Sequence, residues 1–277
     1  MLSRRGFLSA AAAAAAAGLV EANPLGFPIG CQTFPVREAL GKDFDGTLKE
    51  LAGFGYKMIE MCSPPGYEKA GYGFLVGRSA SELKKSIQAA GLGCESCHYN
   101  FSELKEHLDE RIAFAKELGL KQMVLSTFGV KADAPMSEWV KAAEDLNGIA
   151  AKIHGAGMVT GFHNHHFEFK QIDGVLVYDK LMQTLDPKLV KMQFQVSVVN
   201  LGFHAADFMA KYPGRFGSLH LQDWSATDKK MVAVGQGVVD WKKLFGAARK
   251  GGVKNYFVEL NMDALKASCA YLKDLKA

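Results

Sequence analysis

The stretch LKEHLDERIAFAKELGLKQMVLST, residues 104–127, contains one complete helix-to-strand unit. Its apolar residues recur at intervals of three or four, which predicts one face of a helix: Leu104, Leu108, Ile112, Ala115 and Leu118. Gly119 stands where that helix should end. The run that follows, from Leu120, is short and apolar and ends in Ser126-Thr127, as expected of a buried strand.

The same alternation continues in both directions along the chain. Ser79 with Glu82, for example, forms a capping box that predicts the start of another helix. Short apolar or β-branched runs, each followed by helical spacing, begin near Pro28, Tyr56, Leu92, Leu120, Gly157, Leu189, Phe216 and Val253. Their mean spacing of about 32 residues is the length of one strand-helix unit. Eight such units predict a single closed (β/α)8 TIM barrel. The main alternative is an open doubly wound sheet, but no Gly-x-Gly-x-x-Gly follows the first strand.

Composition agrees with one globular domain. The chain has 277 residues, of which 48% are hydrophobic and 22% are charged, so a disordered or fibrous protein is excluded. About 250 residues is typical of one α/β barrel. The net charge is only +4 and no block of five like charges occurs, so the basic patch of a nucleic-acid-binding protein is missing. A homo-oligomer is compatible with this composition.

The first 22 residues differ from the rest. Arg4-Arg5 precedes an apolar run from Ala10 to Val20, and Val20-Glu21-Ala22 resembles a small-residue cleavage site. The pattern is that of a twin-arginine export signal. A membrane anchor is the alternative, but the run is shorter than the ~20 residues that span a bilayer. We therefore expect residues 1–22 to be removed, leaving residues 23–277 as an exported, periplasmic barrel that does not associate with the membrane.

Cys94 and Cys97 form a C-x-x-C, which in another context indicates redox chemistry or half of a zinc site. Here the pair lies in a predicted strand, where this spacing sends the two side chains to opposite faces. There is no second C-x-x-C in the chain. We therefore expect buried free thiols.

Barrel enzymes have their active sites at the carboxyl ends of the strands. The predicted strands end in, or carry near their ends, polar residues: Gln32-Thr33, Glu60, His98, Ser126-Thr127, His163-Asn164-His165-His166, Gln193 and Gln195, His220 and Gln222, and Glu259. Residues two apart in a strand share a face, so His163 with His165 and His220 with Gln222 can point inward together. Imidazole and carboxylate groups at one mouth suit Mn²⁺, Fe²⁺, Zn²⁺ or Co²⁺ better than a bare Mg²⁺ site.

Not every polar strand end requires a function. For His98 and His166 an ordinary hydrogen-bonded or solvated side chain is the simpler interpretation. His220 and Glu259 each follow apolar residues, where a lone ionisable group would be costly to bury without a partner.

Several motifs resemble one known family. They are Tyr56 to Glu60, residues 163–168 (His-Asn-His-His-Phe-Glu), Tyr212 to Phe216, Leu219 to Asp223, Gly235 to Gly237 with Asp240-Trp241, and Tyr256 to Glu259. In order and spacing they are similar to the xylose-isomerase-like TIM-barrel family of sugar isomerases and epimerases. The resemblance covers nearly the whole chain after residue 22 and does not specify a substrate.

The resemblance implies a divalent metal held by a Glu on strand five, an Asp on strand six, a His on strand seven and a Glu on strand eight. His220 and Glu259 match the last two positions. Gln195 stands at the strand-six Asp position, and the strand-five Glu is replaced in its neighbourhood by His163 and His165. Mn, Zn, Co, Fe and Mg all remain candidates for an ion held by these five residues.

The chemistry that the resemblance implies is proton transfer at a carbon next to a carbonyl. Glu259 is then the expected base, with His165 or Glu168 on the opposite face. Glu60, His98, Gln222 and Trp224 are the candidates for lining a sugar pocket. Gln222 stands where many members carry Lys.

Three functions remain open from the sequence. The first is a metal-dependent isomerase or epimerase of a small carbohydrate. We expect this carbohydrate to be unphosphorylated, because the sequence offers few groups that could bind a phosphate at the mouth. The only glycine pair there is Gly235 and Gly237, and Arg215 lies at the start of its strand, away from the mouth. The second is a lyase or hydrolase that cleaves a keto-glycoside. The third is a non-catalytic carbohydrate-binding barrel that has lost its metal.

Overall fold

The computed structural model describes residues 23–131 and 133–276. The predicted export signal, residues 1–22, lies outside them.

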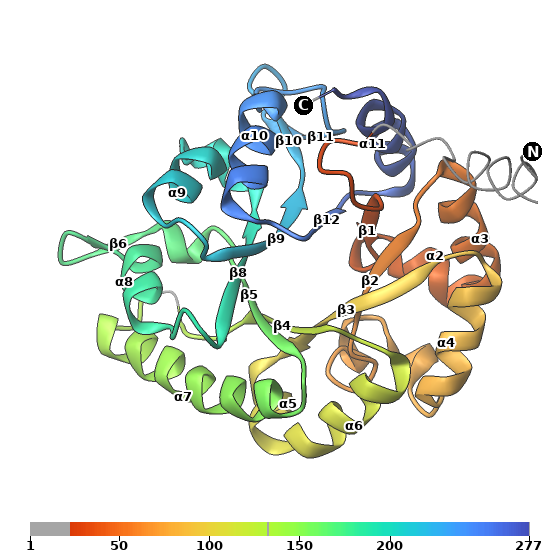
Figure 1. Ribbon diagram of the computed structural model, residues 1–277, viewed down its shortest axis with the longest axis horizontal. Coiled ribbons are helices and arrows are strands. Elements are labelled where there is room, and N and C mark those ends of the chain that lie inside the picture. Colours follow the sequence, from red (N-terminus) through yellow and green to blue (C-terminus); the bar gives the residue numbers. More distant parts are fainter. Residues whose placement is uncertain (1–22, 132, 277) are drawn as a thin grey trace, which may run out of the picture.

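Eight parallel strands close into one barrel, seen end-on in Figure 1. They are β1 Gly30–Gln32, β2 Met58–Cys62, β3 Gly93–Asn100, β4 Gln122–Thr127, β5 Val159–His163, β8 Val190–Gln195, β9 Phe216–Leu221 and β12 Asn255–Val258. Each strand pairs with the next in sequence, and β1 closes the ring on β12 with Gly30 opposite Phe257. The predicted (β/α)8 barrel is confirmed.

Helices surround the barrel and cover its outer face (Figure 1). They are α2 Arg37–Lys42, α3 Phe44–Phe54, α4 Ala80–Ala89, α5 Phe101–Glu106, α6 Leu108–Leu118, α7 Met136–Gly155, α8 Val177–Thr184, α9 Ala205–Lys211, α10 Trp241–Gly251 and α11 Met262–Asp274. Side chains cap several of them. The predicted Ser79–Glu82 capping box opens α4, and Asp240 accepts a hydrogen bond from the Lys243 amide at the start of α10. Such caps satisfy backbone N–H groups that have no partner within the helix.

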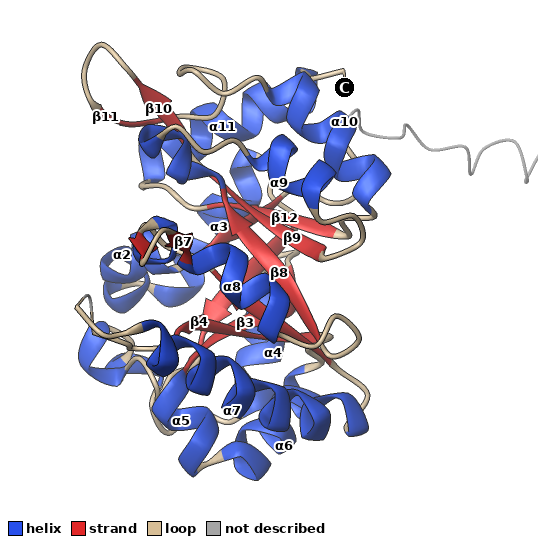
Figure 2. Cartoon of the chain, turned by 90° about the vertical axis from the view of Figure 1, so that its left-hand side faces the viewer, coloured by secondary structure: helices blue, strands red, loops and turns tan. Residues whose placement is uncertain are grey.

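Short elements gather at the carboxyl ends of the strands. Two antiparallel hairpins are β6 Gln171–Ile172 with β7 Val175–Leu176, and β10 Asp223–Ser225 with β11 Lys230–Val232. The 3-10 turns are η1 Phe34–Val36, η2 Glu68–Ala70, η3 Gly73–Leu75, η4 Phe167–Phe169 and η5 Val196–Leu201. Figure 2 shows both hairpins and α2 on one side of the barrel.

The strands begin within two residues of their predicted starts, but two of them end later than predicted. β2 continues past Glu60 to Cys62, and β3 continues past His98 to Asn100. Glu60 and His98 are therefore inside the barrel wall and not at its rim. The helix predicted from Leu104 to Leu118 is also divided. It breaks at His107 because α5 packs on β3 and β4, whereas α6 packs on α4.

The core surrounds the barrel on all sides and consists of aromatic and aliphatic side chains such as Phe162, Phe194 and Leu219. The five cysteines are free, and Cys31, Cys62, Cys97 and Cys269 are buried while Cys94 is half-buried. Burial raises the pKa of the Cys94 thiol to about 12, so it is not a reactive thiolate. Within residues 23–131 and 133–276 no helix is long and apolar enough to cross a membrane.

Candidate active site

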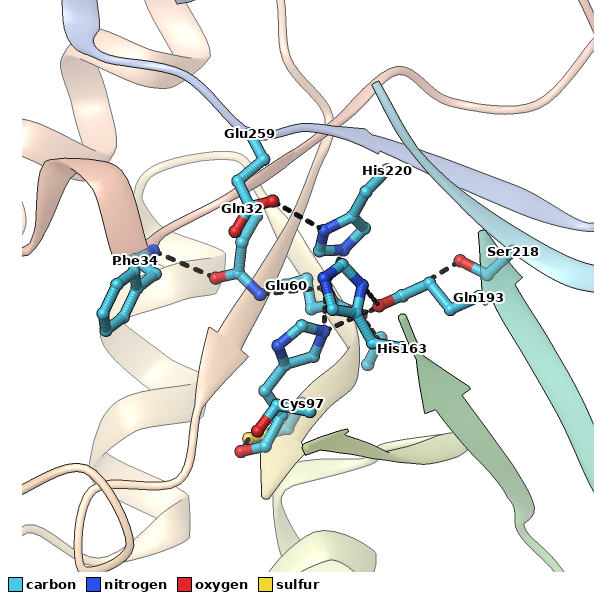
Figure 3. A network of polar contacts seen from close by, with 12 residues as sticks. Gln32, Phe34, Glu60, Cys97, His163, Gln193, Ser218, His220 and Glu259 are labelled. Carbon is cyan, nitrogen blue, oxygen red and sulfur yellow. Dashed lines mark hydrogen bonds and ion pairs between the residues drawn. The ribbon is translucent and has the colours of Figure 1, made fainter. Parts of the chain in front are cut away.

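Polar side chains fill the carboxyl end of the barrel interior and meet at Glu60, which is 0% exposed (Figure 3). Gln32 Nε2 on β1 and Gln193 Nε2 on β8 donate to the Glu60 carboxylate at 2.9 and 2.8 Å. Ser96 on β3 also donates to it. A buried carboxylate needs such donors, because its desolvation is costly without them.

Three histidines from three strands converge on the same point. His98 Nε2 lies 3.1 Å from Glu60 Oε2 and 2.7 Å from Gln193 Oε1. His220 Nε2 contacts the same Glu60 oxygen at 2.5 Å, and the His163 ring lies 4.4 Å from the His220 ring. His163 Nδ1 shares Gln193 Oε1 at 3.0 Å.

The charges in this cluster alternate. Burial alone would lower the pKa of His220, but the Glu60 and Glu259 carboxylates outweigh it and raise that pKa to about 9. Burial would raise the pKa of Glu60, yet His98 and His220 hold it well below its usual range. His163 has a strongly lowered pKa because of its burial and its histidine neighbours. At neutral pH, His220 is therefore a cation between two carboxylates, and His163 is neutral.

Above this cluster a cavity of about 590 Å³ opens at the mouth of the barrel. Its walls are Phe34, Pro35, Arg37, His165, His166, Gln195, Ser197, Val198, Asn200, Leu201, Gln222, Met231 and Glu259. Glu259 is the one carboxylate in this wall, and 15% of its side chain is exposed. The volume lies within the range of small-molecule sites.

Glu259 is held by one of its two oxygens. Its Oε2 is contacted by Gln195 Nε2 at 2.5 Å, His220 Nδ1 at 3.2 Å and Gln222 Nε2 at 3.4 Å. Gln222 Nε2 also donates to the Glu259 backbone carbonyl at 2.6 Å. Oε1 has no hydrogen-bond partner among the described residues, and it does not belong to the buried unpaired atoms either. One carboxylate oxygen is thus anchored and the other is accessible.

Of the two groups predicted for the opposite face, only His165 lies in the cavity wall. Burial lowers the pKa of His165 to about 4, so its ring is neutral at pH 7. Glu168 is 1% exposed and lies in η4, where its Oε2 accepts a hydrogen bond from the His165 amide at 2.8 Å. Burial raises the pKa of Glu168 to about 7.

The four residues predicted to line the sugar pocket are placed differently from one another. Gln222 lies in the cavity wall. Glu60 and His98 lie beneath it, in the buried cluster, because their strands extend past them. Trp224 is on β10 opposite Met231, and it is Met231 that reaches the cavity.

The glycine pair near the mouth has a structural role. Asp223, 0% exposed, accepts hydrogen bonds from the Gly235 and Val239 amides and from Trp241 Nε1 at 2.8–3.1 Å. A side chain on Gly237 would collide with Asp223 Oδ1, because its Cβ would overlap that oxygen. The Gly235–Gly237 turn therefore packs around the Asp223 carboxylate of the chain itself.

The donor set of the buried cluster fits a divalent metal. One ring nitrogen from each of His98, His163 and His220 lies within 4.8 Å of the others, and the Glu60 carboxylate is in contact with two of them. Of the five predicted ligands, the structure brings Gln195, His220 and Glu259 into contact, with His163 beside His220 and its ring 4.8 Å from that of His165.

Sequence reasoning named Gln193 and Gln32 only as polar residues near strand ends and did not name Ser96, although all three organise the cluster. Gln193 contacts His98, His163, Glu60 and Ser218, and Gln32 and Ser96 complete the donors to Glu60. Alternation within strands could have indicated Gln193, since it lies two residues before Gln195 and shares its face. No local signal distinguishes Ser96.

A larger cavity, of about 740 Å³, lies at the opposite end of the barrel between the starts of the strands. Its wall is mainly apolar, and its single carboxylate, Glu95, is paired with Lys121. It has no histidine. Of these two cavities, only the one at the carboxyl end is lined by histidines, within the part of the chain that the structure describes.

Comparisons with known proteins agree with this fold. An inosose dehydratase of Geobacillus thermodenitrificans is 24% identical over 219 residues, which cover 65% of this chain and 73% of that protein. A sugar phosphate isomerase/epimerase of Parabacteroides distasonis superimposes with a TM-score of 0.78 at 23% identity, covering 89% of this chain and 93% of that one. The IOLI protein, solved with a bound zinc atom, superimposes with a TM-score of 0.63 at 16% identity, covering 89% and 94%. Residues 48–275 match the family described as xylose isomerase-like TIM barrel. The chain belongs to the xylose isomerase-like TIM barrel family.

Proposed function

We propose that this protein is an enzyme that removes a proton from the carbon next to a carbonyl group of an unphosphorylated keto-sugar or sugar. The observation that carries the proposal is the state of Glu259. Three donors hold its Oε2, whereas its Oε1 has no protein partner among the described residues and borders the mouth cavity. A fixed carboxylate with one accessible oxygen is arranged as a general base.

The residues around Glu259 divide the remaining tasks. His220 is fully buried and contacts Glu259 through its Nδ1, and this neighbour lowers the pKa of Glu259 and keeps it ionised. Gln222 and Gln195 fix the orientation of the carboxylate. His165, neutral and in the cavity wall, is placed to exchange a proton with a substrate oxygen or carbon. A divalent metal held by histidines such as His220 would supply a Lewis acid that polarises the carbonyl.

Proton removal of this kind is the first step of isomerisation, of epimerisation and of dehydration next to a carbonyl. The relatives include both an isomerase/epimerase and a dehydratase. We therefore place the substrate in the class of polyhydroxylated ketones and aldehydes. Proton removal produces an enolate, and the group that next donates a proton to this enolate decides which of the three products forms.

The cavity wall favours a neutral substrate. Arg37 is its one Lys or Arg side chain, and that guanidinium already donates to the Phe34 carbonyl at 2.8 Å and stacks on the Phe34 ring. A phosphate group would require more cationic donors. Export through a signal in residues 1–22 is part of the same proposal, since unphosphorylated sugars fit an exported enzyme.

Cleavage of a keto-glycoside is the second candidate, and the shape of the mouth favours it. Pro35 and Arg37 line both the mouth cavity and a neighbouring cavity of about 580 Å³. A second sugar ring could occupy that neighbouring space while the first ring meets Glu259.

Exchange in D₂O tests the proposal. The protein is incubated with a panel of ketoses, aldoses and keto-glycosides, with divalent metal supplied, and deuterium at the carbon next to the carbonyl is followed by NMR. Glu259→Gln should slow exchange by roughly 10² to 10⁴, because the base is lost. Glu106→Gln, the same change at an exposed residue of α5, is the matched control and should exchange at the wild-type rate.

Each variant must first show a wild-type unfolding transition. If sugars of the panel bind but exchange no deuterium, the enzyme proposal is wrong and the barrel is a carbohydrate-binding protein. If exchange persists in Glu259→Gln, another residue is the base.

A further inference from the structure

The ligand positions implied by the family resemblance are rich in oxygen, whereas this chain offers mainly nitrogen. A Glu, an Asp and a second Glu would accompany one His. Here His163 and His165 stand nearest to the strand-five position, the strand-six position is Gln195, and only Glu259 keeps its carboxylate.

Gln195 is engaged elsewhere. Its Nε2 contacts Glu259 Oε2 at 2.5 Å, and its Oε1 faces the Ser197 amide at 3.5 Å. Both polar atoms of this amide therefore help to position Glu259 and the start of η5. Gln195 therefore fixes the orientation of Glu259, the proposed base.

A second set of potential metal ligands, most of them imidazole nitrogens, lies beneath Gln195 and Glu259. His98 Nε2 and His220 Nε2 point at one oxygen of Glu60, at 3.1 and 2.5 Å, and the His163 ring lies 4.9 Å from His98 and 4.4 Å from His220. These four residues come from β3, β9, β2 and β5 and are 0–4% exposed. His98 belongs to a strand that contributes nothing to the family positions.

The surroundings of this set are those of a metal centre. Metal-binding histidines and carboxylates usually have hydrogen-bond partners that fix their orientation. His220 Nδ1 contacts Glu259 Oε2 and His163 Nδ1 contacts Gln193 Oε1, while Gln32 and Ser96 donate to Glu60. A bound metal would take the place of the protons between Glu60 Oε2 and the Nε2 atoms of His98 and His220.

We infer that this chain binds a divalent metal on His98, His163, His220 and Glu60, so that His98 and Glu60 replace the strand-six and strand-eight ligands that the family resemblance implies. Three imidazoles and one carboxylate prefer Zn²⁺ or Co²⁺, whereas Mg²⁺ prefers a shell made only of oxygen. The site therefore selects zinc-class ions over Mg²⁺. This inference does not depend on the proposed reaction, because metal binding is measured without substrate.

Metal content and the Co²⁺ spectrum test the inference. The purified chain is stripped with a chelator, reloaded separately with Zn²⁺, Co²⁺, Mn²⁺ and Mg²⁺, desalted and analysed by elemental mass spectrometry. Wild-type protein should retain about one Zn²⁺ or Co²⁺ per chain and no Mg²⁺. Its Co²⁺ form should show visible ligand-field bands of a nitrogen-rich, low-coordinate site.

Two sets of variants locate the ligands. His98→Ala and His163→Ala should each weaken Zn²⁺ binding by more than about 100-fold, the upper range for changes that only disturb a ligand's support. Gln195→Ala is the matched control and should retain Zn²⁺ and the Co²⁺ spectrum. His98→Gln provides a second, less disruptive variant if His98→Ala does not fold.

The outcomes separate the two ligand sets. Loss of metal in Gln195→Ala with retention in His98→Ala would place the ion on the family positions and overturn the inference. Retention of Mg²⁺ in preference to Zn²⁺, or no retained Zn²⁺ in folded wild-type protein, would overturn it as well. A failure of deuterium exchange alone would leave it intact.

Discussion

Glu168 makes the stability of this protein depend on pH, and Glu168→Gln should remove that dependence. The carboxyl group is 1% exposed, and burial raises its pKa from 4.5 to about 7. Between these values the folded state binds more protons than the unfolded state. The free energy of unfolding therefore falls as the pH rises through this window.

The size of the effect follows from the same pKa. At about 1.4 kcal/mol for each pKa unit, the full contribution is about 3.5 kcal/mol, of which about 2.5 kcal/mol is lost between pH 5 and pH 8. The amide that replaces the carboxyl group keeps an oxygen for the His165 N–H and has no proton to lose. The difference in unfolding free energy, variant minus wild type, should rise by about 2.5 kcal/mol from pH 5 to pH 8.

Urea unfolding at pH 5, 6, 7 and 8 measures this difference, and subtracting wild type removes the contribution of every other titrating group. Glu117→Gln, an exposed residue of α6, is the control and should give a difference that does not change with pH. A flat difference for Glu168→Gln would mean that the carboxyl group is ionised in the folded state at pH 5. Such a result would refute the argument from burial.

Three further changes have defined outcomes. Asp223→Ala should lower the free energy of unfolding by about 3 kcal/mol or more, because the buried Trp241 indole N–H and the Gly235 and Val239 amides lose their acceptor. Asp240→Ala, at the exposed N-cap of α10, is the control and should lower it by only about 1 kcal/mol. Both are measured by chemical denaturation, and equal losses would contradict the role given to Asp223. Gly235→Ala should also destabilise, because this residue has φ +89° and its Cβ would overlap the Tyr271 ring; an unchanged melting temperature would speak against it. Replacing Arg4 and Arg5 with lysines should leave the precursor in the cytoplasm, and mature protein in the periplasm at the wild-type level would disprove the export signal.

The sequence by itself was enough for the barrel. Apolar runs and helical stripes alternate eight times, and a strand begins within two residues of each predicted start, as at Phe216 and Val190. Local periodicity carries this information because the side-chain directions of helices and strands repeat at 3.6 and 2 residues. The sequence also indicated Glu259, His220, His165 and Gln222 as site residues, since each stands at or near a predicted strand end.

Only the tertiary structure decided how these residues divide between two layers. The sequence predicted that Glu60 and His98 line the pocket. In the structure each strand continues for two residues beyond them, so both side chains lie in the buried cluster. Glu168 and His165 are three residues apart, yet one is buried beneath the loop and the other lines the cavity. Gln193 was only one of several polar residues near strand ends, yet it contacts two histidines. The depth of a side chain in a closed barrel depends on where each strand ends and on how all eight strands are staggered. That stagger is set by long-range pairing, which no local pattern records.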